Sequence, residues 1–155
     1  MWVAIVGSRT FGDCSHQIHR HPTFPPTPEE KEHAQTCPSI KARELVRHIV
    51  VKWSTRPGFQ GIVSGAAIGA DSLAREACEL LGTTILEIPV PSTPREASFR
   101  ERALGRNSTI VAKADVVVAL FSPGPRSPGT SDTLRKAKQK GVPTYIWHQG
   151  SWSTD

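Results

Sequence analysis

The sequence predicts an α/β domain in which a mostly parallel sheet of about five strands is covered by helices on both faces, in three layers. Short apolar runs alternate along the chain with segments of helical periodicity, an order typical of parallel sheets. The apolar run Val116–Phe121 is continuous instead of alternating, as expected of a strand that is buried on both faces. The length of 155 residues corresponds to a single domain, residues 1–155.

Five apolar runs rich in β-branched residues are expected to form the strands. They are Trp2–Val6, Gly61–Ser64, Thr84–Ile88, Asp115–Phe121 and Thr144–Trp147. Ligands of open α/β sheets bind beyond the carboxyl ends of the strands. The residues that follow each run are therefore the first candidates for a site.

Four segments between these runs carry helix signals. Apolar residues three and four positions apart indicate helices over Ile40–Trp53 and Asp71–Leu81, and Gly82 is suited to end the second. The motif Thr93-Pro94-Arg95-Glu96 has the pattern of a capping box and predicts a helix start. The last helix is expected over Ser131–Lys140.

Two segments lack a regular pattern. Residues 13–39 hold five of the 13 prolines and four of the six histidines, and they are too long for an ordinary connection between a strand and a helix. We expect an irregular insertion there that could close over a ligand. Residues 148–155 are expected to form a loose tail, or to pack on a subunit partner.

Donor atoms suited to zinc occur in this insertion. The candidates are Cys14, His16, His19, His21, His33 and Cys37. Their spacing matches no standard zinc finger, so a flexible His- and Pro-rich loop without metal is the other interpretation. The remaining cysteine, Cys78, is expected to face the core from its helix.

Composition limits the class of protein. Lysine and arginine number 19 against 14 acidic residues, a net charge of +5 that favours anionic partners such as phosphates or nucleic acid. Three cysteines are too few for a disulfide scaffold and favour a reducing compartment. No apolar run approaches the ~18 residues that a membrane span needs, and the first residues lack the basic leader of a signal peptide. We expect a cytoplasmic protein that does not span a membrane.

Two of the expected strands end in segments that suit an anion. The first leads into Gly7-Ser8-Arg9-Thr10, where glycine allows close approach and Arg9 offers donors that match a phosphate. The second leads into Ser64–Asp71, where small residues leave backbone amides uncovered before a helix whose expected N-cap is Asp71. The spacing is that of neither a dinucleotide fingerprint nor a Walker A loop. A turn with a solvated arginine and close helix–strand packing are the structural alternatives.

The fourth expected strand leads into another glycine- and proline-rich loop, Ser122–Ser131. Its residues Gly129 and Thr130 stand at a helix start and can present amides and a hydroxyl to an anion, or form an ordinary capped turn. Before this strand, an arginine cluster (Arg95, Arg100, Arg102 and Arg106) could bind anions or form a solvated helix face. Arg106-Asn107 lies close enough to the strand to point back at its end.

These motifs, in this order, resemble the SLOG superfamily, which groups the DNA-processing protein DprA with the cytokinin-activating LOG phosphoribohydrolases. The similarity covers most of the chain outside the insertion and is closest to small stand-alone YspA-type members, related to YpsA. The matching segments are Gly7-Ser8-Arg9, Ser64–Asp71 with Leu73-Ala74, Arg106-Asn107, Ala114-Asp115 and Gly129-Thr130.

The resemblance implies a Rossmann-like fold that binds nucleotides, nucleotide derivatives or nucleic acid, often as a homo-oligomer. The ligand site it implies consists of Gly7, Ser8, Arg9, Ser64, Gly65, Gly69, Asp71, Arg106, Asn107, Gly129 and Thr130. The leading hypothesis is a module that binds a nucleotide-derived ligand.

Two alternative functions remain open. The LOG hydrolases carry a glutamate three residues after the threonine that matches Thr130, whereas this chain has Thr133, with Asp132 as the nearest acid. A phosphoribohydrolase that cleaves the N-glycosidic bond of a nucleoside 5′-monophosphate would use Asp132 as acid or base and Arg106 on the phosphate. The pI of about 9.4 and the arginine cluster suggest nucleic-acid binding, as in DprA.

Overall fold

In the computed structural model, which describes residues 1–14, 25 and 27–155, the sequence folds around one six-stranded sheet with the order β3-β2-β1-β4-β5-β6. The strands are β1 (Trp2–Gly7), β2 (Gly61–Ser64), β3 (Ile85–Glu87), β4 (Val116–Leu120), β5 (Thr144–His148) and β6 (Ser151–Ser153). Strands β1 to β5 are parallel, and β6 pairs antiparallel with β5. The predicted fold class is confirmed, with one strand more than expected.

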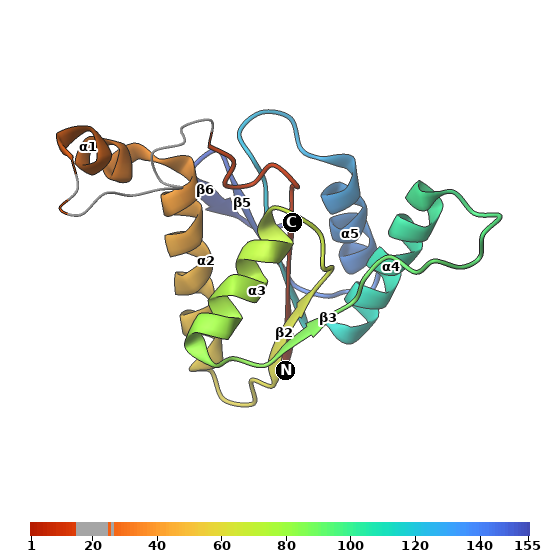
Figure 1. The fold of residues 1–155 in the computed structure, drawn as a ribbon. Coiled ribbons are helices and arrows are strands. Elements are labelled where there is room, and N and C mark those ends of the chain that lie inside the picture. Colours follow the sequence, from red (N-terminus) through yellow and green to blue (C-terminus); the bar gives the residue numbers. More distant parts are fainter. Residues whose placement is uncertain (15–24, 26) are drawn as a thin grey trace.

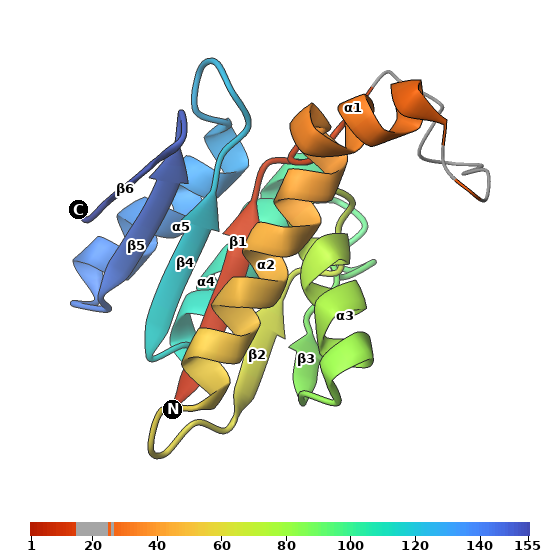
Figure 2. The same cartoon turned by 90° about the vertical axis from the view of Figure 1, so that its left-hand side faces the viewer.

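The described helices are α1 (Pro28–Thr36), α2 (Pro38–Ser54), α3 (Ala70–Leu81), α4 (Phe99–Lys113) and α5 (Pro128–Gln139). Helices α2 and α3 cover one face of the sheet, and α4 and α5 cover the other (Figures 1 and 2). Helix α1 projects from the end of α2 at the margin of the molecule (Figure 2). Among the described residues, no helix combines the length and apolar character that a membrane span requires.

The alternation of side chains along β1 explains the three layers. Val3 and Ile5 point to the side of α2 and α3, whereas Ala4 and Val6 point to the side of α4 and α5, and all four are buried. Each face of the sheet thus has its own apolar core. This arrangement is the Rossmann-like, three-layer form that the continuous apolar strands predict.

The insertion expected over residues 13–39 is regular in its second half. Thr27 caps α1 through a capping box: Thr27 Oγ1 accepts a hydrogen bond from the Glu30 amide (3.2 Å), and Glu30 Oε2 accepts one from the Thr27 amide (3.3 Å). Helix α2 then begins at Pro38, inside the expected insertion. The prediction of irregular structure is wrong for these parts, because Pro28 and Pro38 occupy first helical turns, where proline is compatible with a helix.

Helix α4 begins later than the sequence predicts. Its N-cap is Ser98, whose Oγ accepts from the Glu101 amide (3.1 Å), while Glu101 Oε2 accepts from the Ser98 amide (3.1 Å). Thr93-Pro94-Arg95-Glu96 has the same spacing of cap and acid but precedes the helix. Two equivalent motifs stand five residues apart, and only the second begins α4.

The tail expected to be loose contains β6. Gln149 and Gly150 have positive φ angles of 52° and 77° and join β5 to β6 in a two-residue turn. Trp147 and Trp152 then face each other across the strands, with ring centroids 5.3 Å apart. Such a turn favours a tight hairpin, which explains why Ser151–Ser153 forms a strand where the sequence predicts a loose tail.

The strand order reverses direction between β1 and β4. From β1 the chain proceeds to β2 and β3 on one side, and after the crossover to β4 it proceeds to β5 on the other side. The carboxyl ends of β1 and β4 therefore flank the switch point, which is where open α/β sheets form ligand crevices.

Candidate functional site

A cavity of about 690 Å³ opens at this switch point. Nine of the predicted site residues line it: Gly7, Ser8, Arg9, Asp71, Arg106, Asn107, Gly129, Thr130 and Asp132. Ser64, Gly65 and Gly69 do not line it. A second cavity, of about 430 Å³, lies against the segment between β3 and α4 and includes only Arg106 of the predicted site residues.

Hydroxyl groups join the loop after β1 to the loop after β4. Ser8 Oγ lies 3.3 Å from Ser127 Oγ and accepts a hydrogen bond from the Ser122 amide at 3.3 Å. Thr10 Oγ1 and Ser122 Oγ are 2.7 Å apart. Ser127 Oγ in turn donates to Thr130 Oγ1 at 3.0 Å. These contacts hold the two loops together, and all five residues line the same cavity.

The N-terminus of α5 is open toward this cavity. Its N-cap, Ser127, makes no hydrogen bond from its side chain to a backbone amide. Pro128 occupies the first helical turn. The backbone hydrogen bond from the Ser131 amide to the Ser127 carbonyl oxygen closes this turn. A methyl group built on Gly129 would meet no atom within 4 Å. The amides of the first turn have no partner within the helix, and a helix favours negative charge at this end.

The loop between β2 and α3 has the opposite character. A Cβ on Gly69 would lie 2.3 Å from the Ser8 carbonyl oxygen, and one on Gly65 would lie 2.5 Å from Arg106 Nη1. The prediction that Asp71 is the N-cap of this helix is wrong. Gly69 is the N-cap of α3, and Asp71 lies in the first turn. Asp71 Oδ2 accepts a hydrogen bond from the Ala67 amide at 3.2 Å, because the loop folds back over the helix end. The space beside Gly65 and Gly69 is therefore occupied by other atoms of the protein.

The buried Asp71 and the half-buried Arg106 both lie beside Gly65. Arg106 donates from Nη1 to the carbonyl oxygens of Gly65 and Ile88, the latter at 3.1 Å. Burial raises the pKa of Asp71, and the Ala67 amide and the charge of Arg106 offset this only in part. Burial also lowers the pKa of Arg106. The buried Ser64 hydroxyl also lowers the pKa of Asp71, although neither Ser64 Oγ nor Asp71 Oδ1 makes a hydrogen bond of good geometry among the described residues.

Asn107 and Asp132 connect α4 to α5. Asn107 Nδ2 donates to the Gly129 carbonyl oxygen (3.1 Å) and to Asp132 Oδ2 (3.2 Å). Asp132 also pairs with Arg135 at 2.7 Å and Lys136 at 2.8 Å. Partial burial raises the pKa of Asp132, but the hydrogen bonds from these three neighbours outweigh it, so the pKa lies below its usual value. Asp132 is thus an ionised, paired carboxylate at neutral pH.

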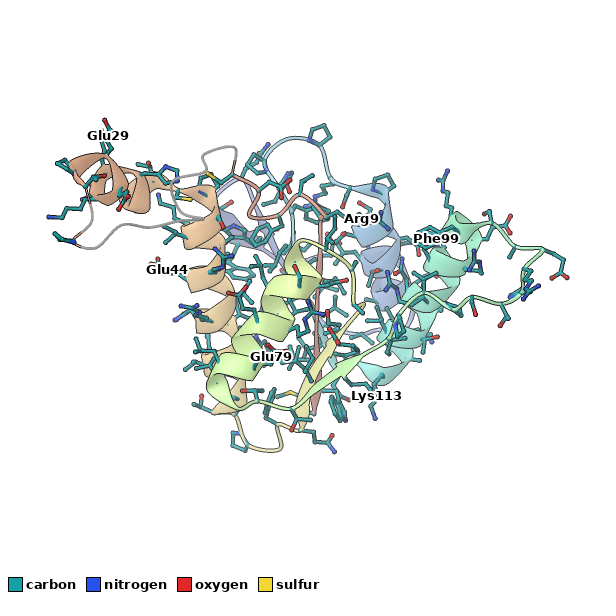
Figure 3. The ribbon with its side chains drawn as sticks, viewed as in Figure 1. Arg9, Glu29, Glu44, Glu79, Phe99 and Lys113 are labelled. Carbon is teal, nitrogen blue, oxygen red and sulfur yellow. The ribbon has the colours of Figure 1, made fainter. Side chains whose placement is uncertain are left out.

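Sequence reasoning missed an aromatic residue at the cavity. Phe99, the first residue of α4, lines the cavity with 53% of its side chain exposed, and the Arg9 guanidinium lies 5.8 Å from its ring centroid. Figure 3 shows the labelled residues Arg9 and Phe99 near each other. The capping motif at Ser98 was the signal that could have placed Phe99 at a helix start.

Three of the six metal candidates come together outside the cavity. One donor atom from each of Cys14, His33 and Cys37 lies within 4.8 Å of the other two, so this group could hold a metal ion. The other candidates, His16, His19 and His21, lie outside the described residues. Cys78 is buried in the core as expected, where burial raises the pKa of its thiol to about 11.

Fold and cavity define an α/β protein with a candidate ligand site at the switch point of a parallel sheet. Comparison of the chain with protein-family models, curated proteins and solved structures found no match. The resemblance to the SLOG superfamily therefore stays a prediction, and function is argued from the geometry of the site.

Proposed function

We propose that this protein binds a nucleotide or a nucleotide-derived ligand in the cavity between β1, β4, α4 and α5, with a phosphate group at the N-terminus of α5. The observation that carries this proposal is the meeting of an uncovered helix N-terminus, a chain of hydroxyls and the exposed Arg9 in one cavity. Its volume of about 690 Å³ lies within the usual range of small-molecule pockets.

The phosphate would be held by neutral donors and one cation. The amides of Gly129 and Thr130 lie in the first turn of α5, and the hydroxyls of Ser8 and Ser127 lie beside it. Arg9 offers a planar fork of donors that matches phosphate oxygens. Arg106 already donates to protein carbonyl oxygens, so we assign it a role in shaping the cavity wall and assign the ligand contact to Arg9.

The base or another flat part of the ligand would lie near Phe99. Its half-exposed ring stands at the cavity with Arg9 beside it. Nucleic-acid bases stack on such aromatic faces, and arginine adds a favourable contact with the same π system. One arginine therefore serves both the phosphate and the aromatic end of the proposed site.

The two alternative functions receive less support. Asp132 is ionised and already bonded to Arg135, Lys136 and Asn107, an arrangement that suits a positioning group better than a general acid. The cavity is a local pocket, whereas nucleic-acid binding needs an extended basic surface. Ligand binding of the kind expected for a SLOG-like domain is thus the function that the geometry supports best.

Calorimetric titration tests the proposal with adenosine and guanosine monophosphates, the corresponding diphosphates, cyclic nucleotides and inorganic phosphate. We expect at least one nucleotide to bind, and Arg9→Ala to weaken it about 10- to 100-fold, because a charge-assisted hydrogen bond contributes about 1.5–3 kcal/mol. Arg95→Ala is the matched control, since Arg95 is exposed, lies outside the cavity and carries the same charge.

The proposal fails if no nucleotide binds at millimolar concentration to the folded protein. It also fails if Arg9→Ala and Arg95→Ala weaken binding equally, because the effect would then be one of net charge alone.

A further inference from the structure

We propose that Cys14, His33 and Cys37 form a zinc site, separate from the ligand cavity and independent of the proposed function. Their donor atoms lie within 4.8 Å of one another, and Cys14 Sγ is 3.7 Å from His33 Nε2. Tetrahedral zinc with Zn–S near 2.3 Å and Zn–N near 2.0–2.1 Å places a sulfur and a nitrogen ligand about 3.6 Å apart. The separation in the protein agrees with this geometry.

The fold delivers these donors from two places in the chain. His33 and Cys37 stand one turn apart at the end of α1, where the Cys37 amide donates to the His33 carbonyl oxygen at 2.7 Å. Cys14 comes from the segment that follows β1, 19 residues before His33. A local helical spacing combined with a distant third donor is the usual construction of a protein metal site.

Cys37 occupies a position that suits a thiolate ligand. It is both the C-cap of α1 and the N-cap of α2, and its side chain is fully buried. Its side chain makes no capping hydrogen bond to α2, so capping does not occupy the sulfur. The N-terminus of a 17-residue helix favours negative charge there.

The donor set identifies the class of metal. Two sulfurs and one imidazole suit zinc, whereas magnesium and calcium require oxygen ligands. The described group leaves one tetrahedral position for a water molecule or a further donor. A bound ion would fasten the segment after β1 to the junction of α1 and α2 at Cys37. The ligand in that segment, Cys14, is four residues beyond Thr10, which lines the cavity.

The experiment measures metal binding directly and needs no ligand for the cavity. The full chain is purified under a phosphine reductant, its zinc content is determined by atomic emission, and the chelator-stripped protein is titrated with Co²⁺. We expect about one equivalent of zinc per chain, a thiolate-to-cobalt charge-transfer band and the visible bands of tetrahedral cobalt.

Two variants and two matched controls locate the site. Cys14→Ser and His33→Gln should each weaken zinc at least tenfold in competition with a chromophoric chelator and reduce the cobalt bands. Cys78→Ala and His48→Gln, which change a buried core thiol and an exposed histidine of α2, should leave both readouts unchanged. Circular dichroism identifies variants that remain folded, and only these are compared.

The assignment is overturned if the folded wild-type chain takes up neither zinc nor cobalt under reducing conditions. It is also overturned if Cys14→Ser and His33→Gln retain wild-type stoichiometry and affinity, because other donors would then hold the metal. Loss of cavity ligand binding alone, with zinc intact, bears on the proposed function and leaves this site standing.

Discussion

The loops after β2 and after β4 look alike in the sequence but differ in the structure. Both run from an apolar strand through glycines into a helix, and the sequence predicts that both present amides to an anion. In the first, Gly69 packs against the Ser8 carbonyl oxygen and Asp71 accepts from the Ala67 amide. In the second, Gly129 faces open space at the start of α5.

The difference separates two uses of glycine. Gly69 is required because its φ of 81° and its neighbours exclude a side chain, so it allows backbone to pack on backbone. Gly129 is not needed for packing and leaves the helix N-terminus accessible. Only the second use creates room for a ligand, which is why the proposed phosphate lies on α5 and not on α3.

The largest expected effect is on folding. Gly69→Ala should lower the free energy of unfolding by about 3 kcal/mol or more, because it combines a disfavoured φ with a Cβ 2.3 Å from a carbonyl oxygen. Gly129→Ala should change it by less than about 1 kcal/mol. Urea denaturation followed by circular dichroism measures both. Equal losses in the two variants would contradict the distinction.

The next effect is on binding. Gly129→Asp places a carboxylate in open space at the first turn of α5, where it suits the helix dipole but repels an anionic ligand. We expect stability to be kept within about 1 kcal/mol and nucleotide affinity to fall about 100-fold or more. Calorimetry with Gly129→Ala as the control checks this. Unchanged affinity in Gly129→Asp would move the phosphate away from α5.

The smallest effects concern the pH dependence of stability, and they have opposite signs in the two helices that follow these loops, α5 and α3. The pKa of Asp132 is lowered in the folded protein, so its contribution to the free energy of unfolding is present at neutral pH and is lost as pH falls through the folded pKa. Asp132→Asn should therefore lower the free energy of unfolding by about 1 kcal/mol at pH 7 and by little in acid.

The pKa of Asp71 is raised in the folded protein, so stability is lost as pH rises through the folded pKa of this carboxyl. Asp71→Asn should therefore stabilise the protein at neutral pH, with a gain that disappears below about pH 4.

Urea titrations between about pH 3.5 and 8, at constant ionic strength, separate these two variants. The comparison would be wrong if both substitutions shifted stability in the same direction at pH 7.

The fold could be predicted because strand and helix periods are local. Each expected strand is present, and the buried stripe of α2 follows the spacing read from Ala42 to Trp53. The start of α4 could not be chosen, because Thr93 and Ser98 head equivalent capping motifs. The hairpin to β6 was missed since Gln149-Gly150 is a weaker turn signal than the usual asparagine–glycine pair.

The candidate site could be predicted in outline only. Strand topology brings Ser8 and Thr130 to one edge, and the residues after strands identify that edge. Whether a glycine serves packing or access depends on what surrounds it: the Ser8 carbonyl oxygen beside Gly69 is more than 60 residues away in sequence. The aromatic Phe99 likewise depends on where α4 starts.

The short hairpin partner β6 affects how the outer margin of the sheet meets other molecules. Without it, β5 would present a row of unpaired backbone groups, a template on which an extended foreign chain can add as another strand. Ser151–Ser153 satisfies part of that row and is itself only three residues long, too short to invite much further growth. We therefore expect this margin to be a poor template for the addition of a further strand.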